Sequence, residues 1–154
     1  MKKGFTIIEL IIVLSVLVIL IGIIVPRMSG MQQQGNVVKA KAELQTLQTA
    51  MESYYMNNGN TYPGTPQQWN YTPSETYFTQ ATPQIVSSVL YDPFNPGNEY
   101  GMYVSQNGKY YAFASYGPGG TSFCTTGPDL VSNTGSIDKN GCTHMICVTN
   151  GTGC

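Results

Sequence analysis

The sequence predicts an α+β fold, in which a long N-terminal helix crosses a membrane and packs on a small antiparallel β-sheet with a Cys-rich C-terminal loop. Phe5 to Val25 is an apolar run of 21 residues, about 30 Å as a helix, which matches the hydrocarbon core of a bilayer. Two runs rich in aromatic and β-branched residues flank Asn107-Gly108, a strong hairpin signal. All four cysteines lie in the last 31 residues.

The apolar run contains a single carboxylate, Glu9. A lone Glu costs about 2.5–3.5 kcal/mol at the centre of a membrane helix on insertion scales, so we expect it to have a partner and a function. The run is not typical of a secretory signal peptide, which has about 7–15 apolar residues and then a small-residue cleavage site. Cleavage before the run, between Gly4 and Phe5, would keep the apolar helix on the mature chain.

The segment Lys2-Lys3-Gly4-Phe5-Thr6-Ile7-Ile8-Glu9-Leu10 closely resembles the class III signal of type IV pilins and of the pseudopilins of type II secretion. The resemblance implies that a prepilin peptidase cleaves after Gly4 and N-methylates Phe5. Glu9 matches the glutamate at the fifth mature position of the family, and Pro26 matches its helix-kinking proline. An unprocessed protein with a single membrane anchor is the alternative.

Cleavage would give Phe5 a free ammonium group four residues before Glu9, on the same face of the expected helix. The carboxylate can then pair with its own amino terminus or with that of a neighbouring subunit. We favour the neighbouring subunit, because an unpaired buried charge is costly and such a pair stabilises assembled subunits over separate ones.

Length and charge limit what the rest of the chain does. The 154 residues suffice for one membrane helix and one domain of roughly 100 residues. The net charge of −1 becomes −3 without Lys2 and Lys3, since five basic and eight acidic residues remain; no basic patch points to nucleic acid. The basic leader predicts a cytoplasmic N-terminus and a domain outside the cytoplasm. We assign a leader (1–4), a transmembrane or filament-core helix (5–25), an amphipathic continuation (26–57) and an exported α+β domain (58–154).

Apolar residues recur at spacings of three and four in the continuation, with polar residues such as Glu43 and Glu52 on the other faces. This pattern predicts an amphipathic helix that packs on its own sheet rather than a free coiled coil. The apolar stripe consists of Val37, Ala40, Leu44, Leu47, Met51 and Tyr54. Pro26 and the nearby glycines predict a kinked or locally unwound region between about Gly22 and Gly35.

The helix is expected to end near Asn57-Asn58-Gly59, a turn-rich sequence. Residues 59–82 read as a long irregular connection, and Thr82-Pro83 predicts the start of a short helix through Leu90. The hairpin pairs residues 99–105 with residues 109–115. Asp92-Pro93-Phe94 before it and residues 115–120 after it resemble the major pseudopilin of type II secretion.

That subfamily typically binds calcium in the loop after the hairpin. Here Gly119 stands where the Asp of that loop is expected, so we expect a solvated turn and no cofactor. Asp129 and Asp138 remain weak candidates for calcium ligands.

Four cysteines in an exported domain predict two disulfides. Three connectivities are open, of which proximity favours Cys124 with Cys142 and Cys147 with Cys154. A zinc site with His144 is less expected in an oxidising space. Disulfides in the C-terminal loop are also familiar in the pilin family.

His144 is the only histidine and no partner base accompanies the many Ser and Thr residues, so we expect no enzyme. The resemblance implies a structural subunit that polymerises with itself from the bacterial inner membrane, through a prepilin peptidase and an assembly platform, into a surface pilus or a type II secretion pseudopilus. The hairpin favours the pseudopilin and the Cys-rich tail a surface pilin. A minor tip-binding subunit and a non-polymerising anchored protein are the alternatives. Asn70 and Asn150 each begin a short, weak N-glycosylation pattern.

Overall fold

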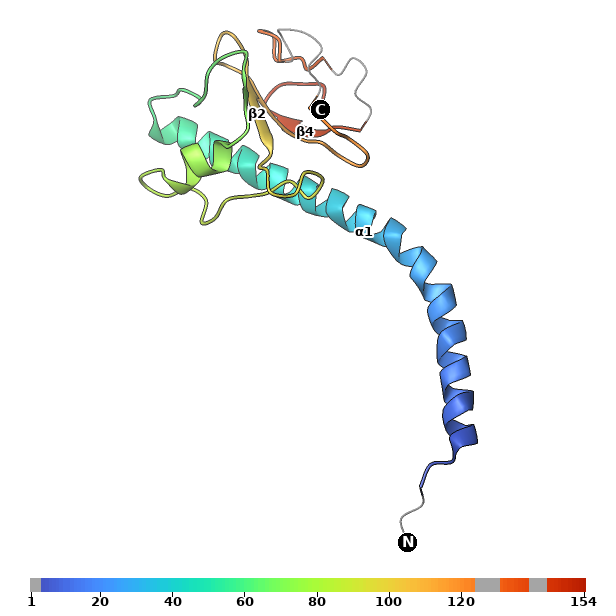
Figure 1. Cartoon of the computed structure of the whole chain (residues 1–154). Helices are drawn as coiled ribbons and strands as arrows, with labels where there is room; N and C mark the ends of the chain where they lie inside the picture. Colours follow the sequence, from blue (N-terminus) through green and yellow to red (C-terminus); the bar gives the residue numbers. More distant parts are fainter. Residues whose placement is uncertain (1–3, 124–130, 139–143) are drawn as a thin grey trace. The chain divides into compact units, whose positions relative to one another are not determined.

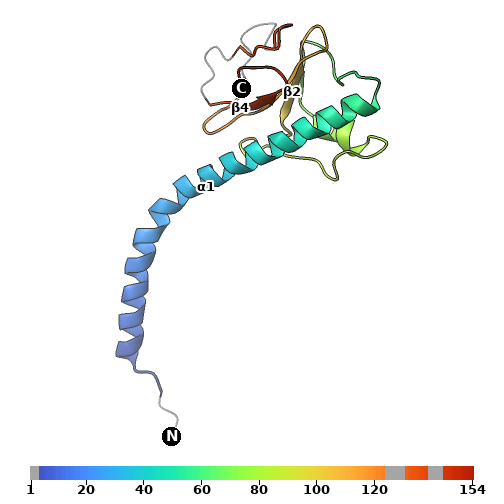
Figure 2. The same cartoon turned by 180° about the vertical axis from the view of Figure 1, so that it is seen from behind.

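The computed structural model describes residues 4–123, 131–138 and 144–154, with the backbone alone for residues 25–29. The chain forms two compact units, Met1–Gly35 and Asn36–Cys154 (Figures 1 and 2). Helix α1, Ile7–Asn57, contributes to both units.

In the first unit, Ile7–Ile24 is apolar and long enough to cross a membrane, and none of this stretch is buried within the chain. The expectation of local unwinding between about Gly22 and Gly35 is wrong, because these residues are helical throughout. A single proline removes one hydrogen bond from a helix and leaves the other bonds of the ladder in place. The kink expected at Pro26 stays a prediction.

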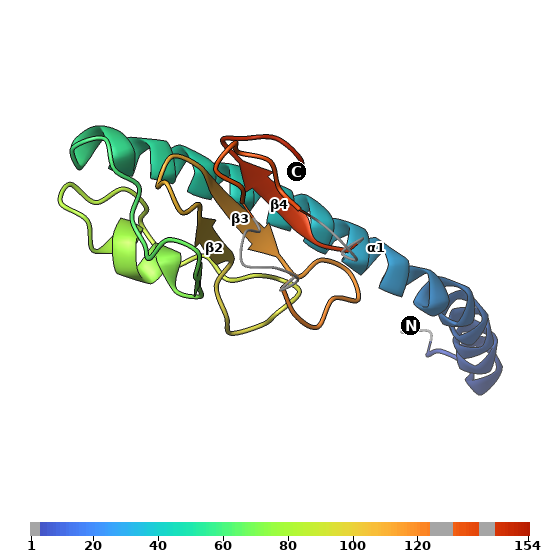
Figure 3. The ribbon, with the colours of Figure 1, turned by 90° about the horizontal axis from the view of Figure 1, so that it is seen from above.

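In the second unit, residues 36–57 of α1 pack on a four-stranded antiparallel sheet (Figure 3). The strands are β1 (Trp69–Asn70), β2 (Gly101–Val104), β3 (Tyr111–Ser115) and β4 (Ile146–Thr149), in the spatial order β1-β2-β3-β4. The predicted apolar stripe is confirmed, since Ala40, Leu44, Leu47 and Met51 are completely buried. The α+β architecture is therefore as expected.

Side chains alternate across the sheet, as the pleat of a strand requires. Met102 and Val104 of β2, with Tyr111 and Phe113 of β3, belong to the core that contains the α1 stripe. The opposite face is covered by side chains from later loops and from β1. These are Trp69, Phe123, Val131 and Ile137.

The predicted hairpin is confirmed. Val104 pairs with Tyr111 at its end, and the N–H of Ser105 donates to the carbonyl of Tyr110 at 2.8 Å. Gly108 has a φ of +66°, a left-handed conformation that glycine adopts without steric cost, and its N–H donates to the carbonyl of Ser105 at 2.9 Å.

The short helix expected from Thr82-Pro83 to Leu90 is wrong. The N–H groups of Ile85 and Val86 both donate to the carbonyl of Phe78, at 3.0 and 3.2 Å, so this segment folds back as a loop. The connection expected to be irregular instead contains β1 and a helix of the π type, η1, Ser74–Thr79. The buried carboxylate of Glu99 accepts hydrogen bonds from the N–H and hydroxyl of Ser74 and thereby holds the first turn of η1.

The C-terminal region contains a strand that the sequence reading did not predict. β4 pairs with β3, placing Cys147 opposite Ala114. The predicted Cys147–Cys154 disulfide is confirmed, with a Cα–Cα distance of 5.3 Å. Cys124 and Cys142 lie outside the described residues.

Candidate assembly segment

The predicted processing junction is exposed. Gly4 and Phe5 precede α1 in a stretch without regular secondary structure, and the Phe5 side chain is 85% exposed. A Cβ placed on Gly4 would meet no other atom within 4 Å. The described residues of the chain therefore do not shield the peptide bond between Gly4 and Phe5 from a peptidase.

Thr6 and Glu9 cap the first turn of α1 reciprocally. The N–H and the hydroxyl of Thr6 donate to the Glu9 carboxylate at 2.9 and 2.7 Å, and the N–H of Glu9 reaches the Thr6 hydroxyl oxygen at 3.3 Å. This is a capping box, in which a Thr at the N-cap and a Glu three residues later satisfy two free N–H groups of the helix start. In the uncleaved chain, the carboxylate therefore has partners of its own.

In the uncleaved chain Phe5 does not share a helical face with Glu9, and the arrangement expected after cleavage stays a prediction. α1 begins at Ile7, and its first backbone bond runs from the N–H of Leu10 to the carbonyl of Thr6, at 3.3 Å. Phe5 thus lies before the N-cap. The signal that could have revealed this is Thr6-x-x-Glu9 itself, the sequence pattern of a capping box.

Glu9 is the only ionisable residue between Ile7 and Ile24, and Ser15 is the other polar one. The Ser15 hydroxyl donates to the carbonyls of Ile11 and Ile12, both at 2.9 Å, so it needs no partner outside its helix. The surface of this stretch is thus apolar except for one carboxylate at its start. Pro26, the other expected assembly residue, is helical, and its side chain is not described.

The calcium prediction stays open. Asp138 is exposed, and Asp129 lies outside the described residues. Within the described ranges, no three side chains of the His, Cys, Asp and Glu types gather in a way that could hold a metal ion. Gly119 has a φ of +77° in the turn after β3.

A buried carboxylate from the Asp92-Pro93-Phe94 motif holds that turn. Asp92 accepts hydrogen bonds from the N–H of Phe94 at 2.9 Å and from the hydroxyl of Ser115 at 2.7 Å. Its second oxygen accepts the N–H of Tyr116 at 2.8 Å. One side chain thus joins the two segments that flank the hairpin in sequence.

Two helix carboxylates expected on the solvent side contact the core instead. The hydroxyls of Tyr100 and Tyr111 donate to Glu43 and Glu52 at 2.6 and 2.7 Å. Burial, and then the hydrogen bond to the carboxylate, raises the pKa of each of these tyrosines well above its ordinary value. Burial and the charge of Glu52 also raise the pKa of Tyr62, to about 12.

Both asparagines of the glycosylation patterns have engaged side chains. The Asn150 amide nitrogen donates to the carbonyl of Lys109 at 3.0 Å and to the Tyr62 hydroxyl at 3.2 Å, while its oxygen accepts the N–H of Tyr111 at 2.9 Å. The Asn70 amide donates to the Tyr77 hydroxyl at 3.2 Å.

Comparison with known proteins gives two family matches. Residues 27–133, more than half of the chain, match the family described as "Type II secretion system (T2SS), protein G". Residues 1–25 match the prokaryotic N-terminal methylation motif.

Individual relatives carry the same description. The chain is 29% identical over 133 residues to the type II secretion system core protein G of Pectobacterium carotovorum, an alignment that covers 77% of this chain and 78% of the relative. It is 33% identical over 66 residues to the core protein G of Aeromonas hydrophila, covering 43% and 46% of the two chains. No solved structure matches the chain.

Proposed function

The chain belongs to the type II secretion system protein G family, the pseudopilins of that system, and we propose that it polymerises from the inner membrane into a secretion pseudopilus. The observation that carries this proposal is the family match over residues 27–133 on a chain whose N-terminal helix leaves Ile7–Ile24 wholly unburied. Family membership favours the secretion pseudopilus over a surface pilus, which remains the second candidate because of the disulfide in the C-terminal region.

The exposed span supports assembly because its surface requires an apolar surrounding. Lipid supplies one while the subunit is in the membrane, and the equivalent helices of other subunits supply one in a filament. The apolar surface is nearly uniform around the helix, so many subunits can pack on it from several sides. Glu9 is the one position on this surface where a specific partner is needed.

Processing supplies that partner. We propose that a prepilin peptidase cleaves between Gly4 and Phe5 and creates an ammonium group next to Thr6, on which the Glu9 capping contact depends. The attraction between opposite charges is strong where little water screens it, so the ammonium group of a neighbouring subunit competes with Thr6 for the carboxylate. Cleavage thus moves Glu9 from a contact within the chain to a contact between subunits.

Two matched variants separate the capping contact from the charge pair. Glu9→Gln retains an acceptor for Thr6 and loses the charge, whereas Thr6→Val loses the hydroxyl and retains the charge. Filaments are sheared from cells, counted by electron microscopy, and their subunit is identified by mass spectrometry. We expect Glu9→Gln to abolish filaments with unchanged amounts of membrane-bound subunit, and Thr6→Val to assemble. Normal filaments from Glu9→Gln would contradict the pairing, and a wild-type subunit absent from every filament would contradict the function.

The proposed topology places Asn36–Cys154 outside the cytoplasm. The basic leader supports this orientation, as does the Cys147–Cys154 disulfide, which requires an oxidising space. Protease added to intact spheroplasts should degrade this unit, and degradation only after the membrane is permeabilised would contradict the orientation.

A further inference from the structure

Asparagine is followed by glycine at four places in the chain, Asn58-Gly59, Asn107-Gly108, Asn140-Gly141 and Asn150-Gly151. In such a pair, the backbone nitrogen of the glycine can attack the side-chain carbonyl carbon of the asparagine, and the missing Cβ of glycine leaves this approach open. Asn140-Gly141 lies outside the described residues. The other three pairs differ in the number of hydrogen bonds that hold their reacting groups.

Both reacting groups of Asn107-Gly108 are held in the turn of the hairpin. The side-chain oxygen of Asn107 accepts the hydroxyl of Ser105 at 2.7 Å and the N–H of Lys109 at 3.0 Å. Its side-chain nitrogen donates to the carbonyl of Asn133 at 3.0 Å. The Gly108 N–H donates to the carbonyl of Ser105 at 2.9 Å. These bonds must open before the glycine nitrogen can turn towards the asparagine side chain.

Asn150-Gly151 is held in the same way at the end of β4. The Asn150 amide makes the three hydrogen bonds described above. The Gly151 N–H donates to the hydroxyl of Thr149 at 3.0 Å. A Cβ placed on Gly151 would come within 1.9 Å of the carbonyl oxygen of Gly135, so this backbone is also packed closely against a neighbouring loop. Attack by the glycine nitrogen again requires several contacts to open.

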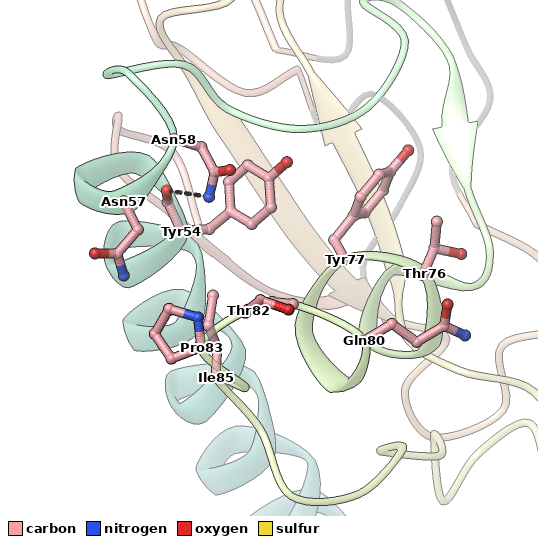
Figure 4. Close-up of a pocket in the computed structure, with 10 residues that line it drawn as sticks. Tyr54, Asn57, Asn58, Thr76, Tyr77, Gln80, Thr82, Pro83 and Ile85 are labelled. Carbon is pink, nitrogen blue, oxygen red and sulfur yellow. Dashed lines mark hydrogen bonds between the residues drawn. The ribbon is translucent and has the colours of Figure 1, made fainter.

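Asn58-Gly59 is held much less. Both residues are exposed, and they directly follow the end of α1. The Asn58 amide nitrogen donates to the carbonyl of Tyr54 at 3.0 Å, as Figure 4 shows. In the described part of the chain, the Asn58 side-chain oxygen accepts no hydrogen bond and the Gly59 N–H donates none. Helix ends fray and open locally at little cost in free energy, so this pair reaches other conformations while the domain stays folded.

We propose that Asn58 is a site of spontaneous deamidation in the folded protein and that the reaction weakens the end of α1. The backbone nitrogen of Gly59 gives up its proton and forms a bond to the side-chain carbonyl carbon of Asn58, and the amide nitrogen leaves as ammonia. Water then opens the cyclic imide at either of its two carbonyl groups. One opening gives aspartate and the other gives isoaspartate. Water is the only co-reactant, and no atom is oxidised or reduced.

The products disturb the cap of α1 in two ways. The N–H of Asn60 donates to the carbonyl of Tyr55 at 3.0 Å across a glycine with a φ of +67°, which is typical of a Schellman motif, and isoaspartate lengthens the backbone inside this turn. In both products, a carboxylate replaces the amide that donates to Tyr54. A negative charge at the C-terminal end of a helix is unfavourable to the helix dipole. Older copies of the protein therefore carry an additional negative charge and a weakened helix end.

Rates of deamidation in the folded and the unfolded chain test the site. The full chain in detergent micelles is incubated in mildly alkaline buffer with and without urea, digested at acidic pH, and mapped by tandem mass spectrometry. In the folded protein, Asn58 should react at least about tenfold faster than Asn107 and Asn150, because at least two further hydrogen bonds must open at the slower sites. In urea the three rates should converge, since glycine follows each asparagine. Equal rates at the three sites of the folded protein, or a slower rate at Asn58, would overturn the proposal.

Two variants at the same position test the effect on α1. Asn58→Gln retains a neutral amide and closes its larger ring more slowly, whereas Asn58→Asp is one of the two products. The urea midpoint of the wild type should fall during incubation towards that of Asn58→Asp, and the midpoint of Asn58→Gln should stay at its initial value. Because all other asparagines are the same, this pair separates Asn58 from every other site. A wild-type midpoint in Asn58→Asp, or equal losses in incubated Asn58→Gln and wild type, would overturn the weakening of α1.

Discussion

The two halves of α1, Ile7–Ile24 and residues 36–57, differ in the burial of their apolar side chains: those of the first are exposed, and those of the second are largely buried. Leu17 in the first half is 47% exposed, although it lies in the middle of an apolar run, whereas Leu47 in the second half is completely buried. The difference follows from the number of apolar residues and from their pattern. Apolar residues cover Ile7–Ile24 on all sides, while in residues 36–57 they recur at spacings of three and four and form one stripe.

The second half of α1 finds the packing partners of its apolar residues within a single chain. The stripe of the second half has all its partners, since Met102, Val104, Tyr111 and Phe113 of the sheet pack against it. In the described part of the chain none of Ile7–Ile24 is buried, so this apolar surface favours a surrounding that is itself apolar.

Of the substitutions that distinguish the two halves, Leu47→Ala should have the largest effect, a loss of free energy of unfolding. Removing a fully buried leucine costs about 2–5 kcal/mol, because apolar contacts are lost and a cavity remains. Leu17→Ala is the matched control and should leave the unfolding of the domain unchanged. Urea denaturation of the full chain in micelles, followed by the fluorescence of Trp69, measures both variants. Equal losses of stability would show that the two halves form one cooperative unit.

A charge in the first half should impair membrane insertion and leave the stability of the domain unchanged. Leu17→Lys places an ammonium group near the middle of the span, which costs about 2.5–3.5 kcal/mol on insertion scales. We expect less subunit in the membrane fraction and unchanged stability of the domain. Gln45→Lys on the exposed side of the second half should insert normally. Full membrane insertion of Leu17→Lys would argue that this stretch does not cross the bilayer.

Removing the Cys147–Cys154 disulfide should have a smaller effect. The bond joins cysteines only seven positions apart, so its loss in the double Ser variant should lower the free energy of unfolding by about 2 kcal/mol. The disulfide anchors β4, so its removal should destabilise the domain and should not alter membrane insertion of the first half. Urea midpoints of the variant and the wild type, both fully oxidised, measure the difference, and identical midpoints would show that β4 pairing alone holds the C-terminal segment.

The tyrosines that contact α1 should have the smallest effect. They change the stability of the domain little at neutral pH and more as the solution becomes alkaline. The pKa of tyrosine is about 10 in an unfolded chain, and that of Tyr62 is raised to about 12 in the domain. The folded state therefore keeps its protons longer, so this stabilisation is complete below about pH 10 and is lost as the pH rises through about 12. Tyr111→Phe removes one group with a raised pKa and should make the loss with pH less steep, measured by circular dichroism. The control is Tyr91→Phe at a half-exposed position. An identical pH dependence in Tyr111→Phe and the wild type would contradict this linkage.

Local patterns were sufficient for the elements that the sequence predicts correctly. The α1 stripe follows from a helical period, and the β2–β3 hairpin follows from an Asn-Gly turn between two runs of strand formers. η1 depends on a carboxylate 25 residues away, since Glu99 caps Ser74. The short stretch Ile146–Thr149 becomes a strand because β3 offers it an edge. Neither dependence can be seen in a local window.

The N-terminal methylation motif was recognisable for the same reason, because it is continuous in the sequence. Even there, the Thr6–Glu9 capping box was missed, although its pattern lies in the printed sequence. The roles of Asp92, Glu43 and Glu52 could not be predicted, since their partners Ser115, Tyr100 and Tyr111 are distant in sequence. A polar residue on a helix is ordinarily solvated, and only the tertiary structure brings a tyrosine hydroxyl to it.

The hydrogen bonds of Asn150 set an order of events. A sugar transferase must reach the amide nitrogen of its asparagine, and in the folded domain this nitrogen donates to Lys109 and Tyr62. With β4 paired to β3, the amide nitrogen of Asn150 is held in these two hydrogen bonds, although the residue stays exposed. An enzyme that modifies this position must therefore break these two hydrogen bonds or act before they form, so that folding itself competes with the modification.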